Sequence, residues 1–302
     1  MAKRLIRAFR VTSSPGASGP VSLINWSAYG SFALPISAAE PPATGSPINL
    51  TYLQVPLLAT PPSFADPYFA FGSSTLTVSP NSGAAIGQGE TLLWCPVDAN
   101  GGSPTDPTPH PRSEGREQRV LGSDSGDWDL TVGTHWQSGV LRVTKWCSPL
   151  NGTSASRTVF NQVHGKIPST GLPVITVIRK PSPGSSTVEI YNIVRTTPAS
   201  GSPTQTSASI SIPDGERFAY ENRIVNGLLT IRIAHPLPAV LVGDVFPYGG
   251  TNVMTLHSYQ FDETWAGGTN YGKAGNYIQD DLTTHSGGVE VVYVRLNWGH
   301  NA

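Results

Sequence analysis

The sequence predicts an all-β fold, an antiparallel β-sandwich of the jelly-roll type with long loops and very little helix. Period-two alternation recurs along many short β-branched or aromatic runs, and almost no segment shows the helical period. Gly 32 and Pro 27 supply turns between these runs. Only 13% of the residues are charged, about half of the roughly 25% usual for a soluble domain. Many short strands with Gly/Pro turns are typical of sandwiches and barrels.

The alternation predicts about fourteen strands, each ended by a Gly, Pro, Asn or Asp turn. In chain order they are Leu5–Val11, Ser22–Phe32, Asn49–Leu58, Tyr68–Val78, Thr91–Pro96, Trp128–Val132, Gly139–Trp146, Arg157–Val163, Val174–Arg179, Ser186–Arg195, Thr206–Ile212, Arg223–Ala234, Asn252–Phe261 and Gly288–Trp298. In the strand over 223–234, Leu229, Ile231 and Ile233 share one face while Thr230 and Arg232 share the other. That pattern predicts a half-buried antiparallel strand.

The connections over residues 33–48, 97–116 and 262–287 are longer than ordinary hairpin loops, and jelly rolls carry such loops at the ends of the sandwich. Two segments are long enough for one helical turn each, Glu114–Arg119 and Asp262–Ala266.

The domain prediction is a short basic N-terminal arm over residues 1–20, followed by a single elaborated jelly-roll domain over residues 21–302. The best candidates for an internal boundary lie near 182–201, where Ser182–Ser186 and Pro198–Gly201 are rich in Ser, Pro and Gly. Strands are expected to resume at once on both sides, which favours one domain.

Net charge is −1, so no global field attracts nucleic acid or an anionic membrane. Residues 1–39 nevertheless hold Lys3, Arg4, Arg7 and Arg10 and no Asp or Glu. A solvated tail is one reading of this segment. An arm that contacts phosphate or the acidic face of a partner is the other.

The densest acidic cluster is a Gly turn with Asp124, Asp127 and Asp129. Three carboxylates so close together supply the hard oxygen ligands that Ca²⁺ prefers, although the order is not that of an EF-hand. The turn therefore predicts either a solvated acidic loop or a Ca²⁺ site between subunits. No other cofactor is expected.

No catalytic signature stands out, so the sequence predicts a protein that is not an enzyme and has no catalytic residues. There is no Gly-x-Ser-x-Gly elbow, no His-Glu-x-x-His and no phosphate loop. The seven histidines never pair at ligand spacing on one strand face. Asp262 and Glu263 are adjacent and would point to opposite faces of a strand, so they cannot flank one glycosidic bond. No apolar run is long enough for a signal peptide or a membrane span.

The basic start with Lys3, Arg4, Arg7 and Arg10, followed by a Ser/Thr/Gly/Pro-rich all-β chain of about 300 residues, resembles the coat protein of a small non-enveloped virus. The resemblance implies a virion subunit, made in the host cytoplasm, that assembles with copies of itself into an icosahedral-type shell. It also implies genome contact through the arm, and a host receptor or glycan bound through outer loops. Further cations that could form an inner basic surface are Arg112, Arg116, Arg119, Lys145, Lys166, Arg179 and Lys180.

Two alternatives stay open. One is a phage or cell-surface β-sandwich module that binds glycans, to which the seven tryptophans could contribute. The other is an enzyme whose site is assembled from distant strands, which a pocket with convergent carboxylates or histidines would favour.

Overall fold

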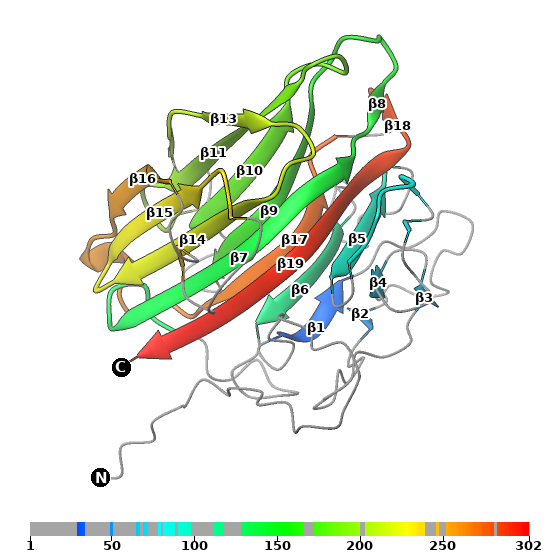
Figure 1. Ribbon diagram of the computed structural model, residues 1–302. Helices are drawn as coiled ribbons and strands as arrows, with labels where there is room; N and C mark the ends of the chain where they lie inside the picture. The colour runs from blue at the N-terminus through cyan, green and yellow to red at the C-terminus, as the bar shows by residue number, and fades with distance from the viewer. Residues whose placement is uncertain are drawn as a thin grey trace, which may run out of the picture.

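The computed structural model describes residues 29–33, 49–50, 65–66, 69–71, 78–79, 81–87, 90–97, 112–117, 128–165, 172–199, 203–238, 246–247, 252–280 and 283–301. These residues form two large antiparallel sheets packed face to face, as Figure 1 shows. Their one helical element is the 3-10 turn η2 (Glu263–Trp265). The predicted all-β sandwich of the jelly-roll type, with very little helix, is confirmed.

The first sheet has nine strands among the described residues, in the order β12-β11-β10-β9-β17-β6-β1-β2, with β13 also paired to β11. Their bounds are β1 (Tyr29–Ala33), β2 (Asn49–Leu50), β6 (Arg112–Glu117), β9 (Ser156–Gly165), β10 (Val174–Lys180), β11 (Thr187–Arg195), β12 (Thr204–Thr206), β13 (Ile210–Pro213) and β17 (Asn270–Ile278).

The second sheet has eight strands in the described part of the chain, in the order β16-β15-β14-β7-β19-β5-β4-β3. Their bounds are β3 (Ala65–Asp66), β4 (Phe69–Phe71), β5 (Thr91–Pro96), β7 (Thr134–Lys145), β14 (Phe218–Val225), β15 (Leu228–Ala234), β16 (Val253–Gln260) and β19 (Gly288–Asn301). The short strands β8 (Ser148–Pro149) and β18 (His285–Ser286) pair separately.

The inward faces of the two sheets form one apolar core. Leu229, Ile231 and Ile233 are fully buried, which confirms the face predicted for that strand. Across the core, the Phe160 ring of β9 meets the Tyr220 ring of β14 edge-to-face at 5.1 Å. Because side chains alternate along each strand, the residues between these core positions face away from the partner sheet.

Two segments predicted as loops contain strands. The connection predicted over 97–116 overlaps β6, and the one predicted over 262–287 contains all of β17. The helical turn predicted at Glu114–Arg119 is wrong, because Arg112–Glu117 pairs with β1 and β17 on its two sides. The turn predicted at Asp262–Ala266 is confirmed as η2, whose N-cap Asp262 accepts a hydrogen bond from the Thr264 amide.

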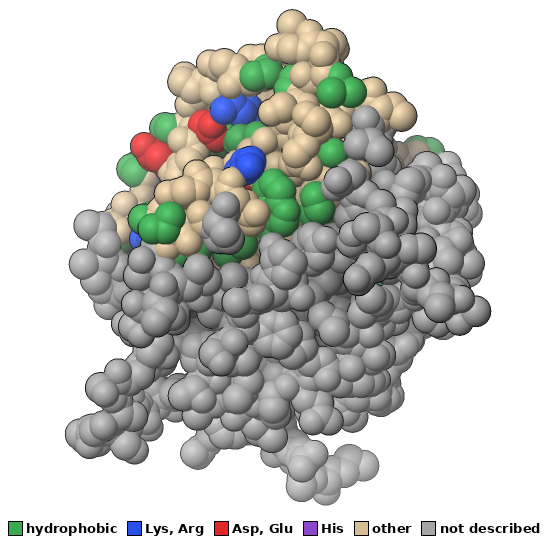
Figure 2. Space-filling view, turned by 90° about the vertical axis from the view of Figure 1, so that its right-hand side faces the viewer, with side chains coloured by type: hydrophobic (Ala, Val, Ile, Leu, Met, Phe, Trp, Pro, Cys, Tyr) green, Lys and Arg blue, Asp and Glu red, His purple; other side chains and the backbone are tan. Residues whose placement is uncertain are grey.

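The arm over residues 1–20 lies outside the described residues. At the candidate boundary, residues 181–186 turn between β10 and β11, which pair with each other in the same sheet. No helix in the described segments is long and apolar enough to cross a membrane. In the face shown in Figure 2, the coloured Lys, Arg, Asp and Glu side chains are few and scattered, with no large patch of one sign.

Candidate active site

The candidate site lies on the outer face of three adjacent strands in the nine-stranded sheet, β6, β17 and β9. In the register of these strands, Arg112 lies opposite Tyr277, and Glu114 lies opposite Gly275. On the other side of β17, Lys273 lies opposite Gln162. The next pair along is Tyr271 with His164. The residues between them, such as Val163 and Ala274, belong to the core, so this polar set faces outward.

Glu114 is the centre of the set. Its carboxylate accepts a short hydrogen bond from the Gln162 amide and another from Lys273 Nζ at 2.7 Å. Arg112 Nη1 lies 3.6 Å from the same carboxylate, and Glu114 itself is almost fully buried. Burial alone raises the pKa of Glu114, but the charges of Lys273 and Arg112 and the Lys273 hydrogen bond outweigh it, so the pKa lies below its ordinary value. Glu114 therefore stays ionised and orders its three donors.

Gly275 makes this close arrangement fit. A Cβ at this position would fall 2.4 Å from the Glu114 Cα, closer than real Cβ contacts come. Only glycine lets β17 approach β6 at the level of Glu114 without displacing that residue.

Two aromatic contacts complete the site. The imidazole of His164 stacks on the Tyr271 ring with centroids 5.0 Å apart and planes 15° apart. The Arg112 guanidinium lies 4.4 Å from the centroid of the Tyr277 ring. His164 and Tyr277 are half-buried, whereas Tyr271 is 7% exposed. On these three strands, His164 and Tyr277 are thus the more accessible groups of the set that can transfer a proton.

The outer face continues over β10 and β11. Half-buried Ile175, Tyr191, Ile193 and Arg195 point the same way, because their neighbours in the chain, such as Val174 and Val194, are core residues. The site is therefore one part of a wider outward-facing surface.

Cations and a carboxamide at one point, with a histidine and a tyrosine beside them, can bind a carboxylate and move a proton near it. Gln162 has two amide N–H donors, and Glu114 uses one of them. Lys273, Gln162 and Arg112 all lie around Glu114, and of these Gln162 is almost fully buried while Arg112 and Lys273 are half-buried.

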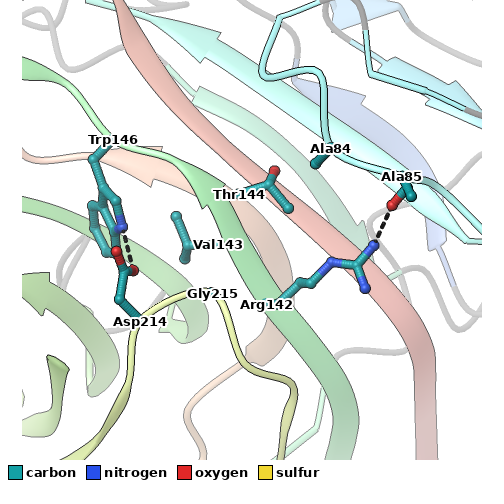
Figure 3. Close-up of a pocket in the computed structure, with 8 residues that line it drawn as sticks. All are labelled: Ala84, Ala85, Arg142, Val143, Thr144, Trp146, Asp214 and Gly215. Atoms are coloured by element: carbon teal, nitrogen blue, oxygen red, sulfur yellow. Dashed lines mark hydrogen bonds between the residues drawn. The ribbon is translucent and has the colours of Figure 1, made fainter. Parts of the chain in front are cut away.

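A second candidate is a pocket of about 390 Å³ on the eight-stranded sheet. Figure 3 shows its lining residues, Ala84, Ala85, Arg142, Val143, Thr144, Trp146, Asp214 and Gly215. Its polar groups bond to one another or to nearby residues: Trp146 Nε1 donates to Asp214 at 2.8 Å, and Arg142 Nη2 donates to the Ala85 carbonyl at 2.7 Å. None of the described residues that line it is a histidine or tyrosine, and its one carboxylate, Asp214, is already bonded to Trp146 Nε1 and to Lys180 Nζ at 2.7 Å.

None of the residues of this candidate site is one of the predicted site residues. Lys3, Arg4, Arg7, Arg10, Asp124 and Asp127 lie outside the described residues. Asp129 is described, and its two carboxylate oxygens accept hydrogen bonds from the Thr131 amide and hydroxyl, both at 2.7 Å, and from the Gly267 amide at 2.5 Å. The described residues contain no cluster of three or more His, Cys, Asp or Glu that could hold a metal. Ca²⁺ at this turn stays a prediction.

Comparison with known proteins identifies the family. A family model described as alginate lyase matches residues 87–300, more than two thirds of the chain and all three site strands. The chain belongs to the alginate lyase family.

Solved alginate lyases share its fold. The enzyme from Klebsiella pneumoniae is 16% identical with a TM-score of 0.62, over 90% of this chain and 95% of that one. The enzyme from Pseudomonas aeruginosa is 23% identical with a TM-score of 0.53, over 79% and 88%. Family 7 alginate lyase A1-II′, solved with substrate as a variant with a His→Asn and a Tyr→Phe change, is 19% identical with a TM-score of 0.55, over 79% and 83%. No curated protein matches the chain.

Membership of this family overturns the functional predictions. The resemblance to a viral coat protein is wrong, and with it the virion location, the self-assembled shell, the genome and receptor partners, and the absence of catalysis. A β-sandwich that binds glycans was the closer alternative, but it included no reaction. Short strands with Gly/Pro turns are common to β-sandwiches in general, so they could not separate a coat subunit from a lyase.

Sequence analysis predicted no residue of the candidate site as a site residue: Arg112, Glu114, Gln162, His164, Tyr271, Lys273 and Tyr277. It assigned Arg112 to a basic inner surface and left His164 without a role. The available signal was polar residues at i and i+2, as in Gln162 and His164, within segments that otherwise read as strands.

Proposed function

We propose that the protein is a lyase that cleaves a polysaccharide of the alginate type by β-elimination. The observation that supports this most is the outward-facing row Arg112, Gln162, His164 and Tyr277, ordered around the buried Glu114 within the segment that matches the alginate lyase family. Alginate is a polymer of uronic acids, so every sugar unit carries a carboxylate.

Charge favours such a substrate. Arg112 and Lys273 bring two positive charges and Glu114 one negative charge, so this group keeps a net positive charge. This net positive charge attracts a polyanion and favours the binding of its carboxylates.

The reaction requires a proton to leave the carbon next to the carboxylate. Arg112 and the second N–H of Gln162 bind that carboxylate and stabilise the negative charge that develops on it as the C–H bond breaks. His164, as the neutral imidazole, accepts the proton. Its stack on Tyr271 fixes the plane of the ring.

The bond to the departing sugar then breaks. The electron pair of the broken C–H bond forms a C=C bond in the uronate ring. The C–O bond on the neighbouring carbon breaks, and its oxygen leaves with the departing sugar. Tyr277 gives its phenolic proton to the leaving glycosidic oxygen, next to the Arg112 guanidinium that lies over its ring. A histidine and a tyrosine are also the residue types changed in the A1-II′ variant solved with substrate.

The test is to incubate the full chain with alginate, polygalacturonate and a neutral polysaccharide. The new C=C bond is conjugated with the carboxylate, so product formation is followed by ultraviolet absorbance and confirmed by the mass of the fragments. We expect absorbing, unsaturated ends from alginate, no cleavage of the neutral polymer, and loss of the signal in His164→Asn. Fragments that gain a water molecule would indicate hydrolysis and contradict the proposal, as would no cleavage of alginate by the folded protein.

A further inference from the structure

A second buried acid, Glu117, lies on the core-facing side of β6, opposite the outer face that carries the candidate site. Glu117 of β6 faces the core side, and its Oε2 accepts hydrogen bonds from the Gly272 amide and from Trp128 Nε1, both at 2.9 Å. Its Oε1 accepts a short hydrogen bond from His300 Nε2 of β19. Glu117 is 3% exposed, so all of these contacts are made away from solvent.

The chain of contacts continues to a second histidine. Nδ1 of His300 lies 2.7 Å from Nδ1 of His135 on β7, and Nε2 of His135 lies 2.7 Å from the Val132 carbonyl oxygen. The His135 ring stacks on Trp128 at 4.3 Å, which fixes its plane.

Glu117 holds the backbone of β17 between two residues of the candidate site. Gly272 lies between Tyr271, which supports His164, and Lys273, which binds Glu114. On its core side Gly272 is covered by Trp298, since a Cβ there would fall 1.5 Å from the indole ring. The Gly272 backbone is therefore hydrogen-bonded to Glu117, and the Trp298 indole packs against it. The indole leaves no room for this backbone to shift toward the core.

The geometry of these hydrogen bonds fixes how many protons the ring nitrogens of His135 and His300 carry. The Val132 carbonyl accepts only, so His135 Nε2 carries a proton. An ionised Glu117 also accepts only, so His300 Nε2 carries one as well. Two facing Nδ1 atoms 2.7 Å apart must share exactly one more proton, because two lone pairs or two N–H groups would repel. The two rings together hold three protons, one more than two neutral imidazoles, and this charge balances Glu117.

We propose that Glu117, His300 and His135 form a proton-sharing chain that holds β17 at Gly272, and that they are positioning residues for Tyr271 and Lys273 in the candidate active site. The inference rests on the proposed lyase function for its kinetic consequence only. The third proton is required by this geometry, because without it two lone pairs would face each other and Glu117 would be an unbalanced buried charge.

Among the described residues, few other charged groups lie near the histidine pair. Strand β6 contributes Glu117. The turn after Trp128 contributes Asp129, whose carboxylate interacts with the charge of His135. The strands β7 and β19 contribute the two histidines, while β17 contributes only the Gly272 backbone, because Lys273 points to the opposite face. Burial alone would raise the pKa of Glu117, but the hydrogen bond and charge of His300 and the bonds from Trp128 and Gly272 lower it. Glu117 and Asp129 are therefore the two carboxylates that interact with the histidine pair.

The first arm of the test measures protons without substrate. Nitrogen-15 NMR of the labelled full chain distinguishes protonated from bare ring nitrogens. We expect Nε2 of both His135 and His300 to be protonated near neutral pH, and one proton to be shared between their Nδ1 atoms. Two neutral rings beside an ionised Glu117 would overturn the proposal. Because this arm needs no activity, a folded protein that fails to cleave alginate would contradict the proposed function and leave this result standing.

The second arm compares Glu117→Gln with Glu117→Ala. The glutamine oxygen can keep the bonds from Gly272 and Trp128, while its NH2 donates to His300 Nε2. Both rings are then neutral with every contact retained. Alanine removes the carboxylate that accepts the hydrogen bond from the Gly272 amide. We expect kcat to fall about tenfold in Glu117→Ala, the cost of one buried hydrogen bond to a charged group, with a smaller change in KM.

Glutamine is expected to restore most of kcat, because it keeps the hydrogen bond from the Gly272 amide. The Gly272 amide proton reports this hydrogen bond independently, since its resonance should move upfield in Glu117→Ala and less in Glu117→Gln. Equal kcat in folded Glu117→Ala and wild type, or an unmoved Gly272 resonance, would overturn the positioning role.

Discussion

The outer faces of the two sheets both carry buried carboxylates, but they pair them differently. On the eight-stranded sheet, Glu90 is bonded to Arg142 and Arg217, and Glu221 to Arg232. Glu290, fully buried, accepts hydrogen bonds from three hydroxyl groups.

On the nine-stranded sheet, Glu114 orders Gln162, Lys273 and Arg112 beside His164 and Tyr277, which are half-buried and able to transfer a proton. A buried charge in a strand is therefore not itself a mark of function. The distinguishing feature is a satisfied charge next to groups that can exchange protons and still meet a substrate.

The largest expected effect separates the two tyrosines of the site. Tyr277→Phe removes the proposed proton donor and is expected to lower kcat about 10²- to 10⁴-fold, the range usual for loss of a general acid. Tyr271→Phe keeps the ring that stacks on His164, so its kcat should stay within about threefold of wild type. Steady-state kinetics on alginate checks both. A larger loss in Tyr271→Phe than in Tyr277→Phe would reverse the assignment.

The next effect compares one carboxylate from each sheet. Glu114→Ala leaves Lys273, whose side chain is 12% exposed, without its ion pair. Breaking such a buried pair costs about 3–5 kcal/mol of stability. The released Gln162 and Arg112 should also lower kcat/KM about 100-fold.

Glu90→Ala is the matched control, because it leaves Arg142 and Arg217 without their carboxylate and should destabilise the fold without lowering kcat/KM of the folded enzyme. Urea unfolding and kinetics on the same samples test this. Equal kinetic losses in the two variants would remove the distinction between the sheets.

The smallest effect is a difference in the sign of pH dependence. The pKa of Glu114 is below its ordinary value of 4.5, so its contribution to stability is present above that pH and is lost as pH falls through the lowered pKa. For buried Asp280, burial raises the pKa despite hydrogen bonds from Ser156 and the Arg157 amide. Its contribution is therefore greatest at low pH and is lost as pH rises through the raised pKa.

Replacing each acid by its amide should therefore act in opposite directions. Asp280→Asn keeps an oxygen for Ser156 and Arg157 and should raise stability at neutral pH by about 1 kcal/mol, while Glu114→Gln should lower it. Thermal unfolding across pH measures both. Destabilisation by Asp280→Asn at neutral pH would show that the ionised carboxylate is favourable there.

The sandwich was predictable from the sequence, but the strands of the site were not. The strands β10, β11, β15 and β19 alternate apolar residues plainly. In contrast, β6 and β17 were assigned to loops and a helical turn. Their core-facing positions include Ser113, Gly115 and Gly272, since residues such as Trp298 from the partner sheet fill the space in front of them. When the inward residues of a strand are small and its outward residues are charged, its sequence resembles that of a turn.

The site was missed for a related reason. Arg112, Gln162 and Lys273 each stand on a different strand, and only the pairing register brings them to one carboxylate. Single-sequence reasoning cannot fix that register once two of the three strands are unrecognised. The i and i+2 spacing of Gln162 and His164 was visible, but by itself it indicates only that two polar side chains share a face.

The most direct test of which face is functional is a crystal structure of the His164→Asn/Tyr277→Phe double variant with an alginate oligosaccharide. Our account predicts the sugar chain across the outer face of β6, β17 and β9, with one uronate carboxylate on Arg112 and Gln162 and the positions of His164 and Tyr277 beside the adjoining glycosidic bond. An oligosaccharide bound instead in the pocket of Trp146 and Asp214 on the eight-stranded sheet would contradict it.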